Sequence, residues 1–269
     1  MSTATLGAAA APDASAHSAP NGPLALEIAN LHGWYGESHV LHGVNLQVRR
    51  GEVVTLLGRN GAGRTSILRA ITGLIGKRAG SIKVNGVETV GLATHRIAHL
   101  GIGYCPEERG IFSSLTAEEN LLLPPVLGVG FLRALGGSFG SGQEAGMSVE
   151  EIYAMFPNLR ERRHSQGTRL SGGEQQMLAV GRILRTGANL LLLDEISEGL
   201  APVIVQALAQ MITTLRAKGY TIVMVEQNFR FAAPLADRFY VIEHGEVIEH
   251  FTAAELEAKM PLLNELLGV

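Results

Sequence analysis

The segment Gly58-Arg59-Asn60-Gly61-Ala62-Gly63-Arg64-Thr65-Ser66 decides the fold of this chain of 269 residues. It follows the apolar run 53–57 and opens a pattern of apolar residues at helical spacing that continues to residue 74. A glycine-rich turn between a buried strand and a helix presents successive backbone N–H groups at the helix N-terminus, where they favour a phosphate. An ordinary tight turn between a strand and a helix is the alternative interpretation.

Arg64 stands where phosphate-binding loops of the form G-x-x-x-x-G-K-[ST] carry a lysine. We expect the Thr65 hydroxyl to ligate Mg²⁺ and Arg64 to bring its positive charge near the β and γ phosphates. A guanidinium is longer and planar, so it does not simply replace a compact ammonium. We therefore expect binding to tolerate this arginine better than hydrolysis does. The residues predicted to contact the phosphates are Gly58, Asn60, Gly61, Ala62, Gly63, Arg64, Thr65 and Ser66.

A second glycine cluster lies at Leu170-Ser171-Gly172-Gly173-Glu174-Gln175-Gln176. Ser171 and Glu174 form a capping-box pattern, so a well-made helix start is one interpretation. A capping box does not require the glycine pair, however, and Gly172 and Gly173 leave bare N–H groups at the start of the helix. The cluster is therefore a second candidate anion site.

Two carboxylates, Asp194 and Glu195, follow the apolar run 190–193. Open α/β sheets bind ligands at the carboxyl ends of their strands, where these side chains would lie. Asp194 suits the outer shell of Mg²⁺, and Glu195 suits a base or an orienting group for an attacking water. Carboxylates that merely end a strand are the alternative.

The composition excludes several classes of protein. With 46% hydrophobic and 17% charged residues, the chain can bury a full core and is not a disordered protein. A net charge of −3 provides no general positive field for nucleic acid, so we predict no nucleic-acid partner. The single cysteine, Cys105, cannot form an internal disulfide. Mean hydropathy is high at +0.18, but no apolar run reaches the roughly 18 residues of a membrane helix.

The pattern of strands and helices predicts one α/β core. Short strands occupy residues 24–57, and Asn85-Gly86 and His244-Gly245 predict tight hairpins. The apolar runs 190–193 and 221–225 are separated by a helical pattern, which indicates a parallel sheet covered on both faces.

The remaining segments are a tail and an insert. Residues 1–23 are rich in Ala, Ser and Pro, and we interpret them as a disordered tail. Residues 108–167 read as a helical insert, with capping boxes at Thr116/Glu119 and Ser148/Glu151 and a glycine-rich loop at 128–146.

Together these motifs resemble the ATP-binding subunit of an ABC transporter over residues 24–269. The motifs stand in that family's order: Walker A at 58–66, signature at 170–176, Walker B at 190–195 and D-loop at 197–200. Further segments are similar to the shorter ATPase of branched-chain amino acid uptake systems, the LivF type. They are 104–112, 115–121, 198–202, 225–228 and 266–269.

The resemblance implies an α/β P-loop NTPase of ABC type. Its core at 24–107 and 168–269 would have a mostly parallel sheet and an antiparallel β layer, with a helical subdomain inserted at 108–167. It implies a head-to-tail dimer with a second ABC ATPase subunit, identical or different, that encloses ATP and Mg²⁺. Ser171, Gly172, Gly173 and Glu174 would then contact the neighbour's nucleotide. The other implied partners are two membrane permeases and, indirectly, a periplasmic solute-binding protein, which places the subunit peripherally at the cytoplasmic face of the cell membrane.

The resemblance also assigns three further site residues. Glu107 occupies the position of the Q-loop glutamine and would ligate Mg²⁺ together with Thr65 and Asp194. Gln227 occupies the position of the switch histidine, and its amide can donate to the γ phosphate; a capped strand end is the alternative. Tyr35 sits where the family stacks an aromatic ring on adenine, although Trp34 is the alternative ring and core packing the alternative role.

The resulting functional prediction is the ATP-hydrolysing subunit of an importer for branched-chain amino acids or related small solutes. Glu195 and Gln227 would be its catalytic residues. A non-transport ABC ATPase of DNA repair or translation is one alternative, and a regulatory subunit with weak hydrolysis, because of Arg64, is another. The sequence does not name the solute, since specificity belongs to the binding protein and the permeases.

Overall fold

The computed structural model describes residues 22–124 and 146–267. The predicted tail therefore lies outside the described residues except for its last two positions, and so does the glycine-rich loop except for Gly146. Within the described ranges no helix is both long enough and apolar enough to cross a membrane.

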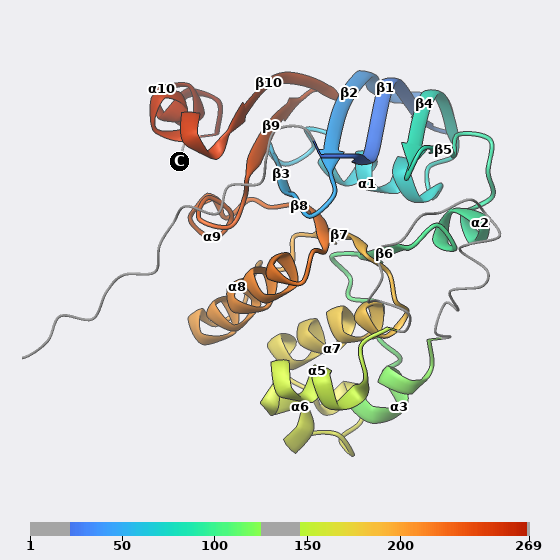
Figure 1. The fold of residues 1–269 in the computed structure, drawn as a ribbon, viewed down its shortest axis with the longest axis vertical. Coiled ribbons are helices and arrows are strands. Elements are labelled where there is room, and N and C mark those ends of the chain that lie inside the picture. The colour runs from blue at the N-terminus through green and yellow to red at the C-terminus, as the bar shows by residue number, and fades with distance from the viewer. Residues whose placement is uncertain (1–21, 125–145, 268–269) are drawn as a thin grey trace, which may run out of the picture.

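Two sheets form the framework of the fold (Figure 1). The antiparallel sheet has the order β2-β1-β4-β5. Its strands are β1 Leu24–Tyr35, β2 Ser38–Arg49, β4 Lys77–Val84 and β5 Val87–Glu88. The mainly parallel sheet has the order β10-β9-β3-β8-β7-β6. Its strands are β3 Val53–Leu57, β6 Ile102–Cys105, β7 Leu190–Asp194, β8 Thr221–Val225, β9 Arg238–Glu243 and β10 Glu246–Thr252.

The helices divide between the sheets and a separate helical region. Those of the described ranges are α1 Arg64–Thr72, α2 Thr94–Ala98, α3 Ala117–Leu122, α5 Val149–Met155, α6 Pro157–Glu161, α7 Gly172–Arg185, α8 Pro202–Ala217, α9 Phe229–Ala232 and α10 Leu256–Leu267, with 3-10 turns η1 Gly167–Arg169 and η2 Ala253–Glu255. Helices α3, α5, α6 and α7 gather at the end of the molecule opposite the antiparallel sheet (Figure 1). Helices α3, α5 and α6 fall within the range 108–167 that the sequence analysis assigns to a helical insert.

The apolar strands of the parallel sheet face two hydrophobic cores. Successive side chains of a strand point to opposite faces, so Leu190 and Leu192 join one core while Leu191 and Leu193 join the other. The first core fills the space toward the antiparallel sheet and α1, and the second packs against α7 and α8. Both faces are covered, which explains the continuous apolar runs predicted to be buried strands.

Several local predictions are confirmed. Asn85-Gly86 and His244-Gly245 both adopt positive φ, as tight hairpin turns require. The three capping boxes, at Thr116, Ser148 and Ser171, are all formed. The strands predicted at 53–57 and 221–225 have those same bounds.

The parallel register brings the functional segments to one edge. β3, β8, β7 and β6 are adjacent and parallel, so their carboxyl ends lie side by side. The phosphate loop follows β3, Asp194 and Glu195 end or follow β7, and Gln227 comes two residues after β8.

Candidate functional site

A cavity of about 380 Å³ opens at this edge of the parallel sheet. It brings together most of the site residues predicted from the sequence, which come from four separate segments. The lining consists of Val40, Asn60, Gly61, Ala62, Gly63, Arg64, Thr65, Ser66, Glu107, Glu195, Glu198 and Gln227. Gly58, Asp194, Tyr35 and the signature residues lie outside this lining.

The loop from Gly58 to Gly63 needs its glycines for two different reasons. Gly61 and Gly63 adopt φ angles of 80° and 105°, which disfavour other residues. A Cβ on Gly58 would lie 2.5 Å from the Ile242 carbonyl oxygen, so this glycine lets two strands approach closely. Gly63 caps α1 without any side-chain hydrogen bond to its N–H groups. The N-terminus of α1 therefore faces the cavity with unsatisfied donors that suit an anion.

The Arg64 side chain at the cavity wall is buried and engaged by other residues of the chain. Its side chain is only 4% exposed and forms an ion pair with Glu195, with Nη2 2.9 Å from Oε1. Nη1 donates to the Glu226 carbonyl oxygen at 3.0 Å, and Nη2 also donates to Asn60 at 3.4 Å. Burial lowers the pKa of Arg64, although Glu195 and neighbouring carboxylates oppose this. The cation predicted to meet the phosphates is thus engaged by the carboxylate predicted to be the base.

Thr65 and Asp194 are linked directly. The Thr65 hydroxyl donates to Asp194 Oδ1 at 3.0 Å, and the Tyr104 hydroxyl donates to Oδ2 at 3.1 Å. Burial raises the pKa of Asp194, while these two hydrogen bonds lower it. Two of the three residues predicted to ligate Mg²⁺ are therefore in direct contact, and Tyr104 holds the Asp194 carboxylate in place.

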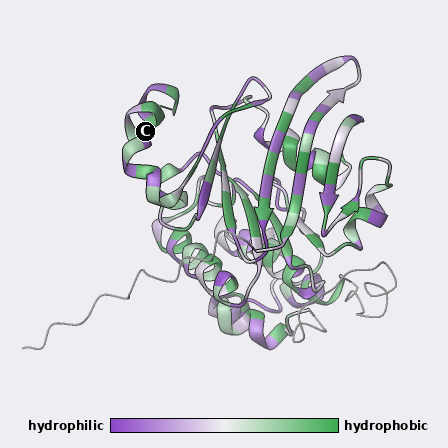
Figure 2. Cartoon of the chain, turned by 45° about the horizontal axis from the view of Figure 1, so that its top comes forward, coloured by the Kyte–Doolittle hydropathy of each residue, from purple (hydrophilic) through white to green (hydrophobic). Residues whose placement is uncertain are grey.

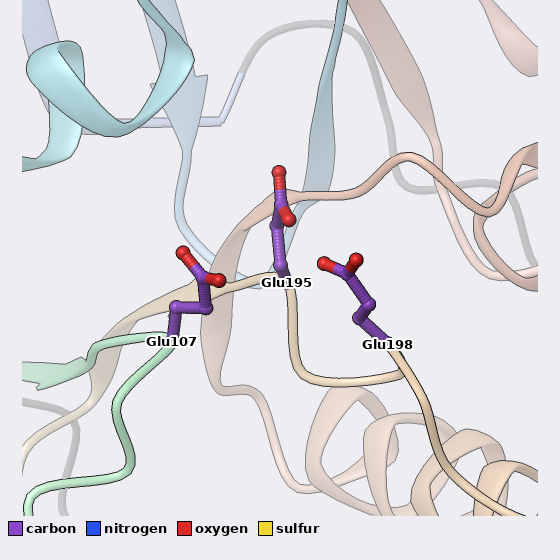
Figure 3. A group of neighbouring side chains, drawn as sticks. All are labelled: Glu107, Glu195 and Glu198. Carbon is purple, nitrogen blue, oxygen red and sulfur yellow. The ribbon is translucent and has the colours of Figure 1, made fainter. Parts of the chain in front are cut away.

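Glu195 adopts a positive φ of 49°, which is uncommon for a residue with a side chain. Its Oε2 accepts a hydrogen bond of 2.8 Å from the Gln227 amide. The carboxylates of Glu107, Glu195 and Glu198 gather within 4.8 Å of one another (Figure 3). Three carboxylates this close together favour a nearby cation or a bound proton, and Arg64 already pairs with Glu195. In keeping with this, a hydrogen bond with Glu195 raises the pKa of Glu198.

Two site residues were not predicted from the sequence. The sequence analysis assigns Glu198 to the D-loop but gives it no role, because nothing in the motif shows that its side chain lines the cavity. Glu226 is 2% exposed, and its carboxylate accepts hydrogen bonds from the Ser197 N–H at 3.2 Å and hydroxyl at 2.7 Å. Its place directly before Gln227 was the one available signal.

The signature residues lie away from the cavity of their own chain. Ser171 caps α7, with the Glu174 N–H donating to its hydroxyl at 3.3 Å. Gly173 is needed for helix packing, since a Cβ there would lie 2.7 Å from Ile204. Gly172 faces the Arg109 guanidinium. The second candidate anion site is thus intact but separate from the phosphate loop.

The aromatic candidates Tyr35 and Trp34 differ in their surroundings. The Trp34 ring is stacked on His39 with centroids 4.4 Å apart, and the Lys77 ammonium lies 4.9 Å from its centroid. Tyr35 is 37% exposed and forms a hydrogen bond with Arg69, which belongs to the helix that follows the phosphate loop. Tyr35 therefore remains the better candidate for stacking on a base.

A glycine-rich loop at a helix N-terminus, with an Asp-Glu pair at the end of a nearby parallel strand, defines a P-loop nucleotide-binding domain. Residues 41–198 match the family model described as ABC transporter, and the chain belongs to that family. It is accordingly an ATPase that binds and hydrolyses ATP in the service of transport.

Named relatives agree with this assignment. The chain is 41% identical to the high-affinity branched-chain amino acid transport ATP-binding protein BraG of Pseudomonas aeruginosa, over 90% of this chain and 99% of that protein. It is 32% identical to the probable branched-chain amino acid transport ATP-binding protein LivF of Archaeoglobus fulgidus, over 86% and 93%. Among solved structures, a dimeric ATP-binding cassette bound to ADP and Pi superposes with a TM-score of 0.69 at 23% identity, over 85% and 98%.

Proposed function

We propose that this chain is the ATP-hydrolysing subunit of an importer for branched-chain amino acids or related small solutes. ATP binding and hydrolysis are supported by one observation: a single cavity is lined by the phosphate loop, Glu195 and Gln227. The solute class is supported by the 41% identity with BraG, which covers nearly the full length of both proteins.

Mg²⁺ fits the oxygen atoms that the site offers. Thr65, Asp194 and Glu107 supply a hydroxyl and carboxylates, the ligands that this hard cation prefers. The crowding of Glu107 with Glu195 and Glu198 also calls for positive charge. When bound with ATP, the ion would neutralise charge on the phosphates.

Groups of the protein itself position the nucleotide and the attacking water. The free N–H groups at the start of α1 hold the phosphates, and Tyr35 stacks on the base. Glu195 accepts a proton from, or orients, the attacking water, and the Gln227 amide donates to the γ phosphate. Phosphate oxygens compete with Glu195 for Arg64, so nucleotide entry would free the Glu195 carboxylate for this task.

The subunit acts in a head-to-tail dimer, identical or mixed. Ser171, Gly172, Gly173 and Glu174 then complete the neighbour's nucleotide site. Their separation from the cavity of their own chain supports this arrangement, since the anion site they form has no use within one subunit.

Two membrane permeases bind on the helical side, and a periplasmic solute-binding protein delivers the solute to them. Support comes from a groove of about 590 Å³ whose lining includes Leu74, Pro106 and Ile183. Exposed apolar side chains at Phe112, Leu122 and Leu123 belong to the same region of the chain. The helices there carry apolar as well as polar stretches (Figure 2). In the proposed assembly the subunit lies peripherally at the cytoplasmic face of the membrane.

Solute uptake in cells that lack the gene tests the proposal. We expect deletion to reduce uptake of radiolabelled leucine, isoleucine and valine, and the wild-type gene to restore it. Glu195→Gln should fail to restore it although the protein accumulates normally, and Glu257→Gln, an exposed glutamate on α10, should restore it. Unchanged uptake after deletion would exclude these solutes, whereas loss of uptake rescued by Glu195→Gln would exclude the catalytic role.

A second candidate function is a nucleotide-binding subunit with slow turnover. The ion pair between Arg64 and Glu195 favours this function, because the guanidinium binds the carboxylate that hydrolysis needs as a base. Arg64→Lys should then raise kcat by roughly tenfold or more, since an ammonium is too short to keep all three of Arg64's contacts. ATPase assays at saturating Mg²⁺ and ATP measure this. An unchanged or lower kcat would show that the arginine is the fully competent residue here.

A further inference from the structure

Three histidines and the single tryptophan of the chain form a cluster on the hairpin of β1 and β2. His32 lies opposite His42 in the strand register, and Trp34 lies opposite His39. The His39 ring is stacked on Trp34 with an interplanar angle of 10°, and its centroid lies 4.0 Å from that of His42. The cluster lies on a paired strand segment, so its side chains have a rigid support.

Two ring nitrogens of this cluster face each other. His32 Nδ1 lies 3.1 Å from His39 Nε2. The other nitrogen of His32, Nε2, lies 3.3 Å from Asn30 Oδ1, which only accepts hydrogen bonds, so the His32 proton belongs on Nε2. This leaves Nδ1 of a neutral His32 with a lone pair directed at His39.

His39 repeats the same arrangement. A hydrogen bond with the Leu41 backbone raises the pKa of His39, and because Nε2 faces His32, we assign this contact to an Nδ1 donor. Partial desolvation and the nearby His42 and His32 lower the pKa of His39, which favours the neutral ring. A neutral His39 therefore also points a lone pair from Nε2 at the 3.1 Å contact.

We propose that His32 Nδ1 and His39 Nε2 together bind one borderline transition-metal dication, of the Zn²⁺ or Ni²⁺ class. Two nitrogens that each lie about 2.0–2.1 Å from one metal ion are about 3 Å apart, which matches their separation. The contacts to Asn30 and Leu41 hold the opposite ring nitrogens as protonated donors, as is usual for metal-binding histidines. His42 is close enough to His39 to supply a further ligand after a side-chain rotation.

Nothing in the nucleotide chemistry uses these rings, so the site is separate from the Mg²⁺ position at Thr65. It is nevertheless adjacent in sequence to the nucleotide site. Trp34 precedes Tyr35, and His39 precedes Val40, which lines the cavity. Any effect of a bound metal on nucleotide affinity rests on the proposed function, whereas metal binding itself does not.

Trp34 provides a probe that is specific for this site. As the only tryptophan, stacked 4.4 Å from His39, it should report Ni²⁺ by fluorescence quenching. In untagged full-length protein at pH 7.5 without nucleotide, we expect saturable quenching and, by calorimetry with Zn²⁺, one ion per chain. Acidification to pH 5.5 should abolish both signals, because protons compete for the imidazole nitrogens.

Variants decide which nitrogens bind the ion. His32→Gln keeps the stack of His39 on Trp34, and we expect it to weaken Ni²⁺ binding roughly tenfold or more, as should His39→Ala in the calorimetric measurement. His95→Ala, an exposed histidine on α2, serves as the matched control and should bind like the wild type. Absence of saturable quenching in the wild type, or equal affinity in His32→Gln and the wild type, would overturn the proposal.

Discussion

Glu226 shows how a single buried residue can serve two parts of the site. Its carboxylate holds the Ser197 backbone and hydroxyl, while its carbonyl oxygen accepts from Arg64. The residue therefore connects the D-loop, the phosphate loop and the adjoining Gln227. Burial raises the pKa of Glu226 to about 7, with Ser197 and Arg64 opposing the shift.

This pKa predicts a defined dependence of stability on pH. Between the ordinary pKa of a glutamate and about 7, the folded protein binds a proton that the unfolded chain releases, so rising pH destabilises the fold through this group. We expect Glu226→Gln to unfold at the same temperature as the wild type near pH 5. Near pH 8 it should be more stable, by on the order of 2–3 kcal/mol. Thermal unfolding at both pH values measures the difference.

The exposed Glu257→Gln on α10 provides the control for that series. It removes a carboxylate without affecting a buried group, so its unfolding temperature should follow that of the wild type at each pH. A stability difference between Glu226→Gln and the wild type that stays constant from pH 5 to pH 8 would show that Glu226 remains ionised in the folded protein.

The sequence could predict residues whose role follows from a local motif. Thr65, Asp194 and Glu195 belong to short patterns with a chemical reason for each position, and the structure places them at one edge. Glu198 and Glu226 could not be found in this way, because their placement depends on how the D-loop packs against the end of β8. The engagement of Arg64 by Glu195 likewise joins residues that are far apart in the chain.

At the scale of elements, the segment after β6 is fastened to α7 by two arginines. Arg109 donates from Nε to Gln176 at 3.2 Å and from Nη1 to Gln175 at 3.0 Å. Arg182 of α7 donates to the Gly110 carbonyl and lies over the Phe112 ring, 4.8 Å from its centroid. The segment that carries Glu107 is thereby tied to the helix that begins with the signature.

Arg109 adopts a left-handed backbone with φ of 63°, which makes a matched pair of variants informative. Arg109→Ala and Arg109→Gly both remove the side-chain hydrogen bonds, but glycine relieves the backbone strain. We expect the glycine variant to be more stable than the alanine variant by about 1 kcal/mol. If the side chain aligns the signature, both variants should lose ATPase activity equally, whatever their stability.

Steady-state ATPase assays and denaturant unfolding of the two variants separate these effects. Activity that follows stability, with the glycine variant recovering most of the wild-type rate, would mean that Arg109 matters for folding alone. A common loss of activity at different stabilities would assign the loss to the contacts with Gln175 and Gln176.

The sequence predicts individual helices, strands and turns where the pattern that indicates them is local. Capping boxes, asparagine-glycine turns and continuous apolar strands each follow from residues within a few positions of one another. The order of the strands was not predictable, because β3 pairs with β8 and β9, which lie more than 160 residues further along the chain. The short strand β6 was not predicted either, because Gly103 interrupts its few apolar residues.

At the scale of the whole molecule, the chain carries two candidate anion sites that do not meet. The phosphate loop and Glu195 line one cavity, whereas Ser171 and Gly172 lie at the start of α7 outside it. Ser171 is exposed at this position, as a group that contacts a neighbouring subunit must be. In the proposed head-to-tail dimer, a second copy or a related subunit would bring each of these groups to its counterpart.

Glu195→Gln tests this arrangement directly. The amide abolishes the base and the ion pair with Arg64 while keeping the size of the side chain, so ATP should bind without being hydrolysed. At saturating ATP and Mg²⁺, we expect this variant to elute at twice the mass of the monomer. Adding Ser171→Arg should restore the monomer, because the arginine places bulk and positive charge where the neighbour's nucleotide would sit. Light scattering on the eluted peak measures the mass. A Glu195→Gln variant that stays monomeric with ATP bound would contradict the sandwich of identical subunits and would require a different subunit as the partner.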